Sequence, residues 1–416
     1  MSQKPESLDG TDGRSESVKA LDNALAEWRV EASSPLLKRE YDKGKAFERL
    51  CRIFLTYDPV QSMQYEPPVP WEQWAECHNL PKIDTGVDLV AKLRNEDGWC
   101  AIQCKFYAKK RTIPKAEIDS FLSASGSKHF SRRLIIDTTG RGWSRNAEDA
   151  LRRQAVPVSR IGLSDLRGSS IRWEDYLSSE KIRFVPKKTL MPHQEKALEK
   201  AAAGLSEPQS RGKMIMACGT GKTLTSLRIA EKIAGPGRRV LWMVPSLGLM
   251  SQTVRQWAQD KEVPICAFAV CSDSQVVKRK IKQDDLADMD ALDLVFPATT
   301  DPEKLAEKIE ARAAGASEAM IVVFATYQSS PVIEKAQKDY GLPAFDLAVC
   351  DEAHRTAGAF SSDTEQSNFV RIHRDEHIRT ERRLYMTATP KIYAESARTR
   401  AGNLAAELCS MEDESI

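Results

Sequence analysis

The sequence has little that would tie it to a membrane, a structural zinc ion or an oxidising compartment. No run of about 18 apolar residues occurs, so we expect no membrane-spanning helix. The nine cysteines include no CxxC pair and no Cys/His spacing typical of zinc sites. A secretory signal peptide is also missing. These absences predict reduced thiols and a cytoplasmic location.

A strong net charge is absent as well. The 61 basic and 59 acidic residues leave a formal charge of +2, so any surface that binds nucleic acid has to be a local patch. A chain of 416 residues exceeds one typical domain and predicts two or three, each with its own core.

The chain does contain two stretches of alternating helix and strand patterns, separated by a basic segment with two prolines. We expect an α/β fold in both. A polar, disordered leader is predicted over residues 1–25, a first α/β domain over 26–180, a linker over 181–188 and a parallel-sheet domain over 189–416. In the last of these, five apolar strands each end in a polar loop, which is typical of a parallel sheet.

The first domain carries a polar pair on an otherwise apolar strand. In the stretch GWCAIQCKFYAK, Gln103 and Lys105 share one face, because side chains alternate along an extended chain. The patterns of residues 86–94 and 99–107 predict two strands of a hairpin around a turn at 95–98.

A carboxylate is expected beside this pair. We expect Arg94 to pair with Trp99 across the turn. In that register Asp88 lies opposite Lys105, on the same face as Gln103. A slip by one residue would move Asp88 to the other face of the sheet.

The group has the chemistry of a metal-dependent phosphodiesterase. Carboxylate oxygens hold Mg²⁺, and a lysine orients the water and stabilises developing negative charge. Glu48, at the edge of an amphipathic helix over residues 43–55, is expected to pack beside the patch. The spacing alone fits a surface ion pair between Asp88 and Lys105 equally well.

The second domain carries a phosphate loop. The stretch GTGKT follows an apolar strand and opens a helix, so backbone N–H groups and the helix N-terminus face phosphate oxygens. Lys222 is expected to reach the β and γ phosphates, and Thr223 to hold Mg²⁺. Met216 replaces the first glycine of the general pattern. The loop residues are Gly219, Thr220, Gly221, Lys222 and Thr223.

Two adjacent carboxylates follow a later strand. Asp351 and Glu352 stand at the C-terminal end of the apolar stretch LAVC, where parallel α/β sheets bind ligands. Asp351 is expected to hold Mg²⁺, and Glu352 to orient or deprotonate the attacking water.

The order of these motifs resembles superfamily 2 helicases, specifically the DEAH-type motor subunits of ATP-dependent restriction enzymes. The resemblance covers about residues 186–412 and implies a RecA-like P-loop domain that binds ATP and Mg²⁺. It implies that Gln194 of LMPHQ contacts adenine and that His354 completes the DEAH motif. The residues that match the family's DNA-contacting or coupling motifs are Pro245, Ser246, Thr326, Thr387 and Thr389.

One part of such a motor has no match. A superfamily 2 motor uses a second RecA-like domain, which brings an arginine finger to the transferring phosphoryl group. No QxxGRxxR box occurs in the sequence. We therefore expect ATP and Mg²⁺ binding but slow turnover and no unaided translocation, as in a truncated product or a fragment of a larger enzyme.

The first domain resembles the Mrr-type restriction endonucleases of the PD-(D/E)xK superfamily. The stretches KGKAFERL, GVDLV, IQCKFY and RLIIDTTG carry the resemblance, which covers about residues 35–170. It implies Asp88 as metal ligand and Gln103 in the place of the second acidic ligand. It also implies Lys105 as catalytic lysine and Glu48 as a supporting acidic residue. Because Gln103 removes one negative charge, we expect weaker Mg²⁺ binding than two carboxylates would give.

Together the two domains resemble the N-terminal part of a Type ISP restriction-modification enzyme, in which methyltransferase and target-recognition domains follow the motor. The resemblance implies a DNA-cleaving, ATP-binding bacterial defence protein. Its implied partners are double-stranded DNA and a complementing motor, methyltransferase or specificity subunit. Two alternatives stay open: a non-catalytic DNA-binding or regulatory remnant, and a repair helicase subunit that needs a second motor domain.

Overall fold

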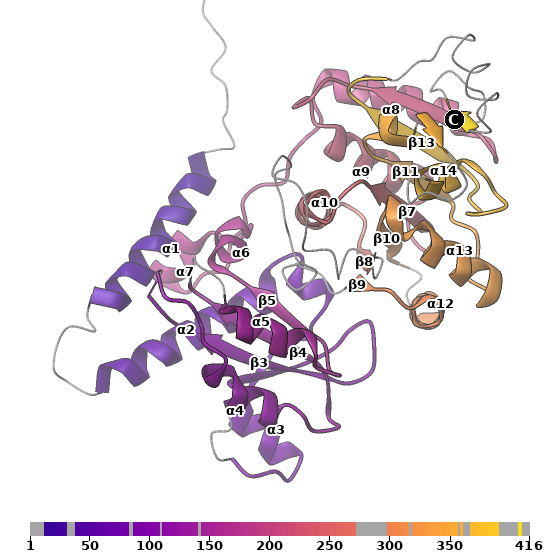
Figure 1. Ribbon diagram of the computed structural model, residues 1–416. Helices are drawn as coiled ribbons and strands as arrows, with labels where there is room; N and C mark the ends of the chain where they lie inside the picture. Colours follow the sequence, from indigo (N-terminus) through magenta and orange to yellow (C-terminus); the bar gives the residue numbers. More distant parts are fainter. Residues whose placement is uncertain are drawn as a thin grey trace, which may run out of the picture. The chain divides into compact units, whose positions relative to one another are not determined.

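Two compact units make up the computed structural model, Met1–Lys187 and Lys188–Ile416. Each is built around a β-sheet with helices packed on it, which confirms the α/β fold class (Figure 1). None of the helices in the described part of the chain is long and apolar enough to cross a membrane. The structure describes residues 12–30, 38–82, 86–108, 110–139, 143–271, 298–315, 318–356, 358–360, 367–390 and 407–409.

The first unit contains a five-stranded mixed sheet in the order β1-β2-β3-β4-β5. The pairs β1–β2 and β2–β3 are antiparallel, whereas β3–β4 and β4–β5 are parallel. The central strand β3 is therefore the place where the predicted hairpin joins an α/β crossover. The strands are β1 (Val69–Pro70), β2 (Leu89–Lys92), β3 (Trp99–Lys105), β4 (Phe130–Asp137) and β5 (Val158–Ile161).

Helices cover both faces of this sheet. Side chains alternate along each strand and therefore pack into two separate cores, one on each face. Cys100 and Ile102 pack into the core that includes α1 and α2, whereas Ala101 packs into the core of α3, α4 and α5. Gln103 therefore points to a largely apolar face. The helices are α1 (Asp12–Val30), α2 (Lys38–Tyr57), α3 (Trp71–Cys77), α4 (Ala116–Ala124), α5 (Arg145–Arg152), α6 (Leu163–Gly168) and α7 (Trp173–Ser179).

The expected disordered leader over residues 1–25 is wrong from Asp12 onward, where α1 begins. Leu21 and Leu25, one helical turn apart, are fully buried in the core of the first unit. Asp22 also accepts three hydrogen bonds from the guanidinium of Arg167, at 2.7, 2.9 and 3.0 Å. Two leucines in a polar segment suffice to anchor α1, because this helix packs against α6 and α7.

The expected linker over 181–188 also begins too early. The backbone of Arg172 donates to Arg183 O at 2.8 Å, and Val185 donates to Ser170 O at 2.8 Å. Residues 183–185 are thus held by the first unit, and the boundary between the units falls after Lys187.

The hairpin is present, but its predicted register is wrong by two residues. Lys92, not Arg94, pairs with Trp99. Strand β2 stops pairing with β3 after Lys92, because the backbone and side chain of Arg94 bind elsewhere. Arg94 N donates to Gln64 O at 2.9 Å, and the Arg94 side chain donates to Tyr65 O at 2.9 Å. A shift of two residues preserves which face each side chain takes.

The second unit contains a seven-stranded sheet in the order β6-β13-β11-β7-β10-β8-β9, and all of its paired strands are parallel. All five predicted strands lie in it, and the strand ICAFAV, which the sequence patterns left out, joins it as β8. The strands are β6 (Arg211–Ile215), β7 (Arg239–Val244), β8 (Ile265–Val270), β9 (Ala298–Thr299), β10 (Met320–Thr326), β11 (Leu347–Cys350) and β13 (Arg383–Thr387).

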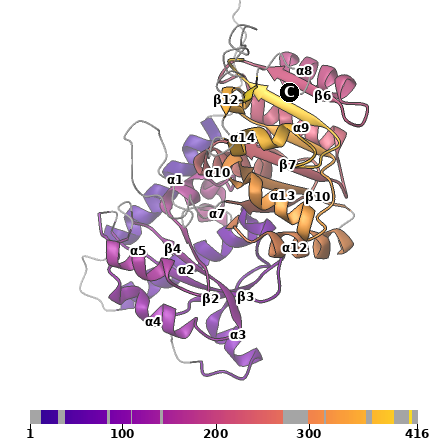
Figure 2. The same cartoon turned by 45° about the vertical axis from the view of Figure 1, so that its right-hand side comes forward.

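Helices cover both faces of this sheet as well (Figure 2). On one face, Trp257 of α10 meets Trp242 edge to face, with ring centroids 4.7 Å apart. On the other, Leu305 of α12 and Ile333 of α13 pack into the core. The helices are α8 (Pro192–Gly204), α9 (Lys222–Ile233), α10 (Leu247–Asp260), α12 (Pro302–Gly315), α13 (Ser330–Asp339) and α14 (Ser367–Val370); a separate ribbon pairs β12 (Gly358–Phe360) with β14 (Glu407–Cys409).

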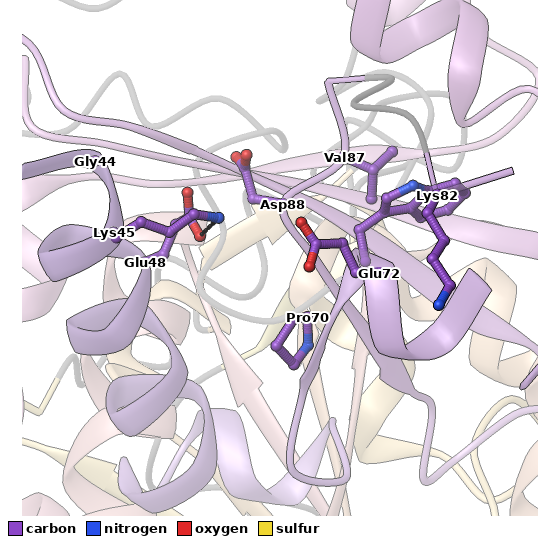
Figure 3. Close-up of a pocket in the computed structure, with 9 residues that line it drawn as sticks. Gly44, Lys45, Glu48, Pro70, Glu72, Lys82, Val87 and Asp88 are labelled. Atoms are coloured by element: carbon purple, nitrogen blue, oxygen red, sulfur yellow. Dashed lines mark hydrogen bonds and ion pairs between the residues drawn. The ribbon is translucent and has the colours of Figure 1, made fainter. Parts of the chain in front are cut away.

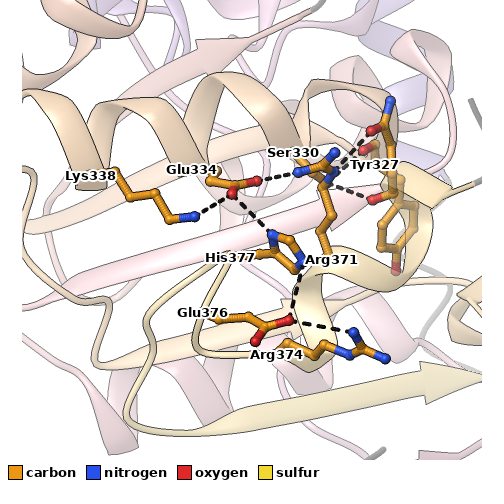
Figure 4. Close-up of polar contacts among 9 residues, drawn as sticks. Tyr327, Ser330, Glu334, Lys338, Arg371, Arg374, Glu376 and His377 are labelled. Carbon is orange, nitrogen blue, oxygen red and sulfur yellow. Dashed lines mark hydrogen bonds and ion pairs between the residues drawn. The ribbon is translucent and has the colours of Figure 1, made fainter. Parts of the chain in front are cut away.

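A charged network ties α13 to the segment before β13 (Figure 4). Glu334 accepts hydrogen bonds from Lys338 at 2.6 Å and from Arg371, and lies 3.0 Å from Nδ1 of His377. Burial raises the pKa of Glu334, but hydrogen bonds from Lys338, His377 and Arg371 outweigh it and lower the pKa below its usual value. The network fixes the chain that leads from α14 into the sheet.

Candidate nuclease and nucleotide sites

Asp88 is held at the start of β2 by hydrogen bonds on both sides. Its N–H donates to Ile102 O at 2.9 Å, and its carbonyl accepts from Trp71 N at 3.0 Å. Its carboxylate accepts from the N–H of Cys104 at 2.6 Å. The side chain thus takes the place of the next backbone acceptor in the β-ladder, which fixes the carboxylate beside β3.

Gln103 lies on β3 one residue before this contact and is only 3% exposed. Its Nε2 donates to Gly86 O at 2.8 Å, while its Oε1 is buried without a hydrogen-bond partner. Most buried polar side-chain atoms have a partner, so an orphaned acceptor calls for an explanation. The hairpin therefore brings Asp88 and Gln103 together, as predicted, although through a different register.

Lys105 ends β3 on the same face as Gln103, two residues further along the strand. Its ammonium lies 5.9 Å from the ring centroid of Tyr107. Tyr107 is itself fixed, because its N–H donates to Thr138 Oγ1 at 2.9 Å. The guanidinium of Arg111 also lies over this ring, at 4.2 Å. Lys105 thus stands at the end of the strand in a cationic and aromatic setting.

Three carboxylates line one cavity of about 300 Å³ in this unit (Figure 3). They belong to Glu48 of α2, Glu72 of α3 and Asp88. Glu48 forms an ion pair with Lys45 at 2.8 Å. Glu48 is therefore beside Asp88 as predicted, whereas sequence patterns gave no sign of Glu72. Among the described residues, no three His, Cys, Asp or Glu side chains lie close enough together to hold a metal ion directly.

The phosphate loop of the second unit is shaped by two left-handed glycines. Gly219 has φ +78° and Gly221 has φ +84°, and α9 begins at the next residue, Lys222. A Cβ on Gly221 would lie 2.1 Å from Nε2 of Gln194, so no larger residue fits without moving that amide.

Gln194 lies on α8 and closes the phosphate loop from one side. Its Nε2 donates to Thr220 O at 2.9 Å, and its Oε1 accepts from Met191 N at 2.9 Å. His193 Nε2 also lies 3.1 Å from Thr220 O. Both ends of the Gln194 amide are thus satisfied within the protein.

Lys222 turns back into the loop. Its ammonium donates to Met216 O at 3.4 Å and lies 4.0 Å from Oε1 of Glu352. Thr223 follows in the first turn of α9, where its carbonyl accepts from Trp257 Nε1 at 3.1 Å. Lys222 and Glu352 therefore meet at the C-terminal edge of the sheet, as the motifs predicted.

Asp351 and Glu352 stand directly after β11. Burial raises the pKa of Asp351 to about 6, since desolvation outweighs the hydrogen bond from Glu352 N at 2.9 Å. Glu352 adopts φ +48°, a rare conformation for a residue with a side chain. Its backbone is held because Tyr327 Oη donates to Asp351 O at 2.8 Å.

His354 links the DEAH motif to β13. Its Nδ1 lies 2.9 Å from Thr387 Oγ1, which also accepts from Thr389 N at 3.1 Å. The phosphate loop reaches the same point, because Met216 N donates to Thr387 O at 3.1 Å. Three predicted motifs therefore converge on one threonine.

Comparison with known proteins divides the chain at nearly the same place as the structure. The family described as restriction endonuclease matches residues 56–183, and the family described as Type III restriction enzyme, res subunit, matches residues 187–392. A restriction endonuclease domain precedes a helicase-type ATPase domain in this chain. We refer to them as the endonuclease domain and the motor domain.

One solved structure of a Type ISP enzyme is similar to this chain across both domains. The ATP-dependent Type ISP restriction-modification enzyme LlaBIII bound to DNA is 36% identical with a TM-score of 0.73, over 91% of this chain and 24% of that one. A nuclease-deletion mutant of the Type ISP enzyme LlaGI with a DNA substrate mimic is 35% identical, with a TM-score of 0.40, over 55% of this chain and 19% of that one. This chain thus spans about a quarter of the length of LlaBIII. A search of curated protein sequences returns no match.

The residues of the endonuclease domain fit a hard divalent cation. Such ions take oxygen ligands; Asp88 offers a carboxylate fixed at Cys104 N, and the preceding residue, Gln103, offers an Oε1 without a hydrogen-bond partner. In the motor domain, the buried carboxyl group of Asp351 and the hydroxyl of Thr223 offer the oxygen donors expected for a nucleotide-bound Mg²⁺.

The residues that match the family's DNA-contacting or coupling motifs differ in how far their side chains are exposed to solvent. Ser246 caps the N-terminus of α10, since its Oγ accepts from Leu249 N at 3.4 Å. Pro245 is buried before it. Thr326 is fully buried, with its Oγ1 2.7 Å from Ser329 Oγ. Thr389, in contrast, is exposed at the end of the motor sheet.

Proposed function

We propose that this chain cleaves double-stranded DNA in a Mg²⁺-dependent reaction and binds ATP with Mg²⁺, as part of a bacterial restriction system in the cytoplasm. The endonuclease domain performs the cleavage, and the motor domain engages DNA in response to nucleotide. The observation that carries the proposal is the contact between the hairpin strands, where the Asp88 carboxylate accepts from the N–H of Cys104, the residue that follows Gln103 and its unpartnered oxygen. Lys105 follows two residues later on the same strand.

In the endonuclease domain each residue has one task. Asp88 and Gln103 would hold the divalent cation, which would supply Lewis-acid chemistry at the scissile phosphate when bound. Lys105 places its ammonium at the end of β3, where it stabilises the negative charge that develops on the phosphate. Glu48 supports the site from α2, with its own charge balanced by Lys45.

In the motor domain the loop from Gly219 to Thr223 wraps the phosphates, with Lys222 exchanging its contact with Met216 O for a phosphate oxygen. Asp351 and Thr223 hold Mg²⁺, and Glu352 orients the water. Gln194 contacts adenine by exchanging one of its two present partners, Thr220 O or Met191 N, for the base. His354 and Thr387 carry the state of the nucleotide site to Thr389.

A plasmid-cleavage assay with Mg²⁺, with and without ATP, tests the proposal. Lys105→Ala is expected to lower cleavage by about 100-fold or more, because one preformed charge-stabilising donor contributes that much. Lys92→Ala is the matched control, since Lys92 is an exposed lysine at the end of β2 in the same hairpin. Its cleavage rate is expected to equal that of the wild type.

Three results would count against the proposal. Wild type that cleaves under no condition contradicts the nuclease assignment and favours a DNA-binding module. Equal losses in Lys105→Ala and Lys92→Ala contradict the role of Lys105. ATP binding unchanged in Lys222→Ala contradicts the nucleotide site.

A further inference from the structure

The proposed catalytic lysine, Lys105, carries its ammonium on a long side chain at the end of β3. A lysine side chain rotates freely about several bonds, so an ammonium that acts on one phosphate needs a group that holds it in place. We propose that Tyr107 is the positioning residue of this site and that the face of its ring holds the Lys105 ammonium. This inference rests on the proposed nuclease function and adds a residue to it.

The strand itself brings the ring beside the lysine. Ala101 lies in the core of α3, α4 and α5, and Tyr107 packs against the same core, whereas Phe106 packs against the opposite one. The alternation of β3 thus continues for two residues beyond its end, which puts Lys105 and Tyr107 on one face. The Lys105 ammonium lies over the ring, 5.9 Å from its centroid. A cation at that distance is attracted by the negative face of an aromatic ring.

Thr138 fixes the backbone on both sides of Phe106. Its N–H donates to Lys105 O at 3.2 Å. Its hydroxyl accepts from Tyr107 N at 2.9 Å and donates to Tyr107 O at 2.8 Å. Because Thr138 is fully buried, the backbones of Lys105 and Tyr107 are held to one point of the core.

A second cation supports the ring. The guanidinium of Arg111 lies 4.2 Å from the centroid of the Tyr107 ring and forms an ion pair with Glu117 of α4. Arg111 N donates to Ala108 O at 2.9 Å, so a turn returns the chain to the ring. Glu117 offsets the charge of Arg111 and thereby reduces its repulsion of the lysine at the same ring.

The ring holds the ammonium without neutralising it. A carboxylate beside Lys105 would form a charge-assisted hydrogen bond with it and occupy donors that a phosphate needs. A ring face attracts a cation but carries no net charge. Lys105 therefore keeps its charge and its N–H donors for the substrate.

The test is single-turnover cleavage of plasmid DNA by the whole chain with Mg²⁺. Tyr107→Leu removes the ring and is expected to lower the rate at saturating protein about tenfold. The protein concentration for half-maximal rate stays unchanged, because Lys105 acts on the transition state rather than on DNA binding. Tyr107→Phe keeps the ring face and is expected to cleave within about twofold of the wild type.

A double-mutant cycle with Lys105→Ala decides whether the ring acts through the lysine. In the Lys105→Ala background, Tyr107→Leu is expected to change the remaining rate by less than about twofold, since the group that the ring positions is gone. A loss in that background equal to the loss in the wild type would show that Tyr107 supports the fold of the site, and the inference would be wrong.

Tyr176→Leu is the matched control. It removes a partly buried tyrosine from α7 in the same domain, where the ring packs against the core on the other face of the sheet and lies 6.2 Å from Trp173. Its cleavage rate is expected to equal that of the wild type when all variants are assayed well below their melting temperatures. Equal losses in Tyr176→Leu and Tyr107→Leu contradict the inference.

The remaining outcomes separate the inference from the function on which it rests. A loss in Lys105→Ala with none in Tyr107→Leu overturns the role of Tyr107 alone. A loss in Tyr107→Phe as large as that in Tyr107→Leu also overturns it, because phenylalanine has the same ring face. Lys105→Ala that cleaves like the wild type, or wild type that does not cleave, overturns the proposed nuclease site and the inference with it.

Discussion

Each domain places one glutamine amide against a loop with a left-handed glycine, but the two amides differ at their oxygens. Gln103 donates to Gly86 O and Gln194 donates to Thr220 O, at 2.8 and 2.9 Å. The oxygen of Gln194 accepts from Met191 N, whereas that of Gln103 accepts nothing. The amide of Gln194 thus has both ends hydrogen-bonded, whereas the amide of Gln103 keeps an oxygen available for a ligand.

The difference shows how an amide can be a structural brace or a ligand. A buried amide with both ends paired contributes to stability, because the loss of either partner leaves an unsatisfied group. A buried amide with a free oxygen costs stability until something binds it. We therefore expect Gln194 to matter most for the fold of the phosphate loop and Gln103 to matter most for cleavage.

The largest effect is expected for Gln103→Leu. Removal of the proposed ligand oxygen is expected to lower cleavage by about 100-fold, while Gln103→Glu, which restores a carboxylate, keeps activity within about tenfold. ATP binding stays unchanged in both, since Gln194 and its loop are intact. Cleavage rates and nucleotide titrations of the two variants check this, and full activity in Gln103→Leu contradicts it.

Gly221→Ala is expected to destabilise the motor domain by about 2–3 kcal/mol. An alanine is strained in the left-handed conformation of this position. Its Cβ would also lie 2.1 Å from Nε2 of Gln194 and would displace that amide. Gly86→Ala is the matched change, with φ +85° and its nearest contact at 3.1 Å, and we expect about 1–2 kcal/mol. Hydrogen exchange in peptides of each domain measures both, and equal losses would remove the contrast.

Acid is expected to weaken the motor domain through His373. Burial, together with nearby arginines, lowers the pKa of this imidazole to about 3, although a hydrogen bond to Thr356 O opposes the shift. The folded state therefore keeps it neutral while the unfolded state binds a proton below about pH 6.5. Stability is fully present above that pH and is lost as the pH falls toward 3, by about 2 kcal/mol between pH 6.5 and 5.

Urea unfolding of the motor domain at a series of pH values checks this slope. His373→Gln is expected to be less stable at neutral pH, because it loses the contact with Tyr385 Oη at 3.0 Å, but to show a flatter dependence on pH. An unchanged slope in this variant would assign the acid sensitivity to other groups.

The smallest effect is expected for Glu334→Gln, by about 1 kcal/mol, since the network around it is only partly buried. The lowered pKa of Glu334 means that its contribution is present above about pH 4.5 and is lost as the pH falls through the lowered value. Glu303→Gln, on the exposed side of α12, is the control. Unfolding free energies at pH 7 and at pH 3.5 distinguish the two, and a loss of equal size at both pH values contradicts the role of the charge.

Local chemistry made the motor site predictable. The phosphate loop is contiguous in the sequence, and its glycines, lysine and threonine carry their geometry with them. Asp351 and Glu352 follow an apolar strand directly, so their place at the edge of a parallel sheet followed from the pattern. In the structure, Nζ of Lys222 lies 4.0 Å from Oε1 of Glu352, at the sheet edge that the sequence pattern predicts.

Long-range pairing limited what could be predicted for the endonuclease site. The face shared by Asp88 and Gln103 followed from alternation, but the register did not, because Gln64 and Tyr65 compete for the chain beyond Lys92. Glu72 was missed for the same reason, since its place depends on the pairing of β1 with β2. Helix α1 was missed because its two leucines are buried by elements about 140 residues away.

The hydrogen bond from Met216 N to Thr387 O has a thermodynamic consequence. This hydrogen bond joins the phosphate loop to the end of β13, so we expect a ligand that shifts one to shift the other. Linkage then requires reciprocity: if nucleotide changes the affinity of the Thr387–Thr389 edge for DNA by some factor, DNA changes the affinity for nucleotide by that same factor. The two binding equilibria would then be coupled through this one hydrogen bond.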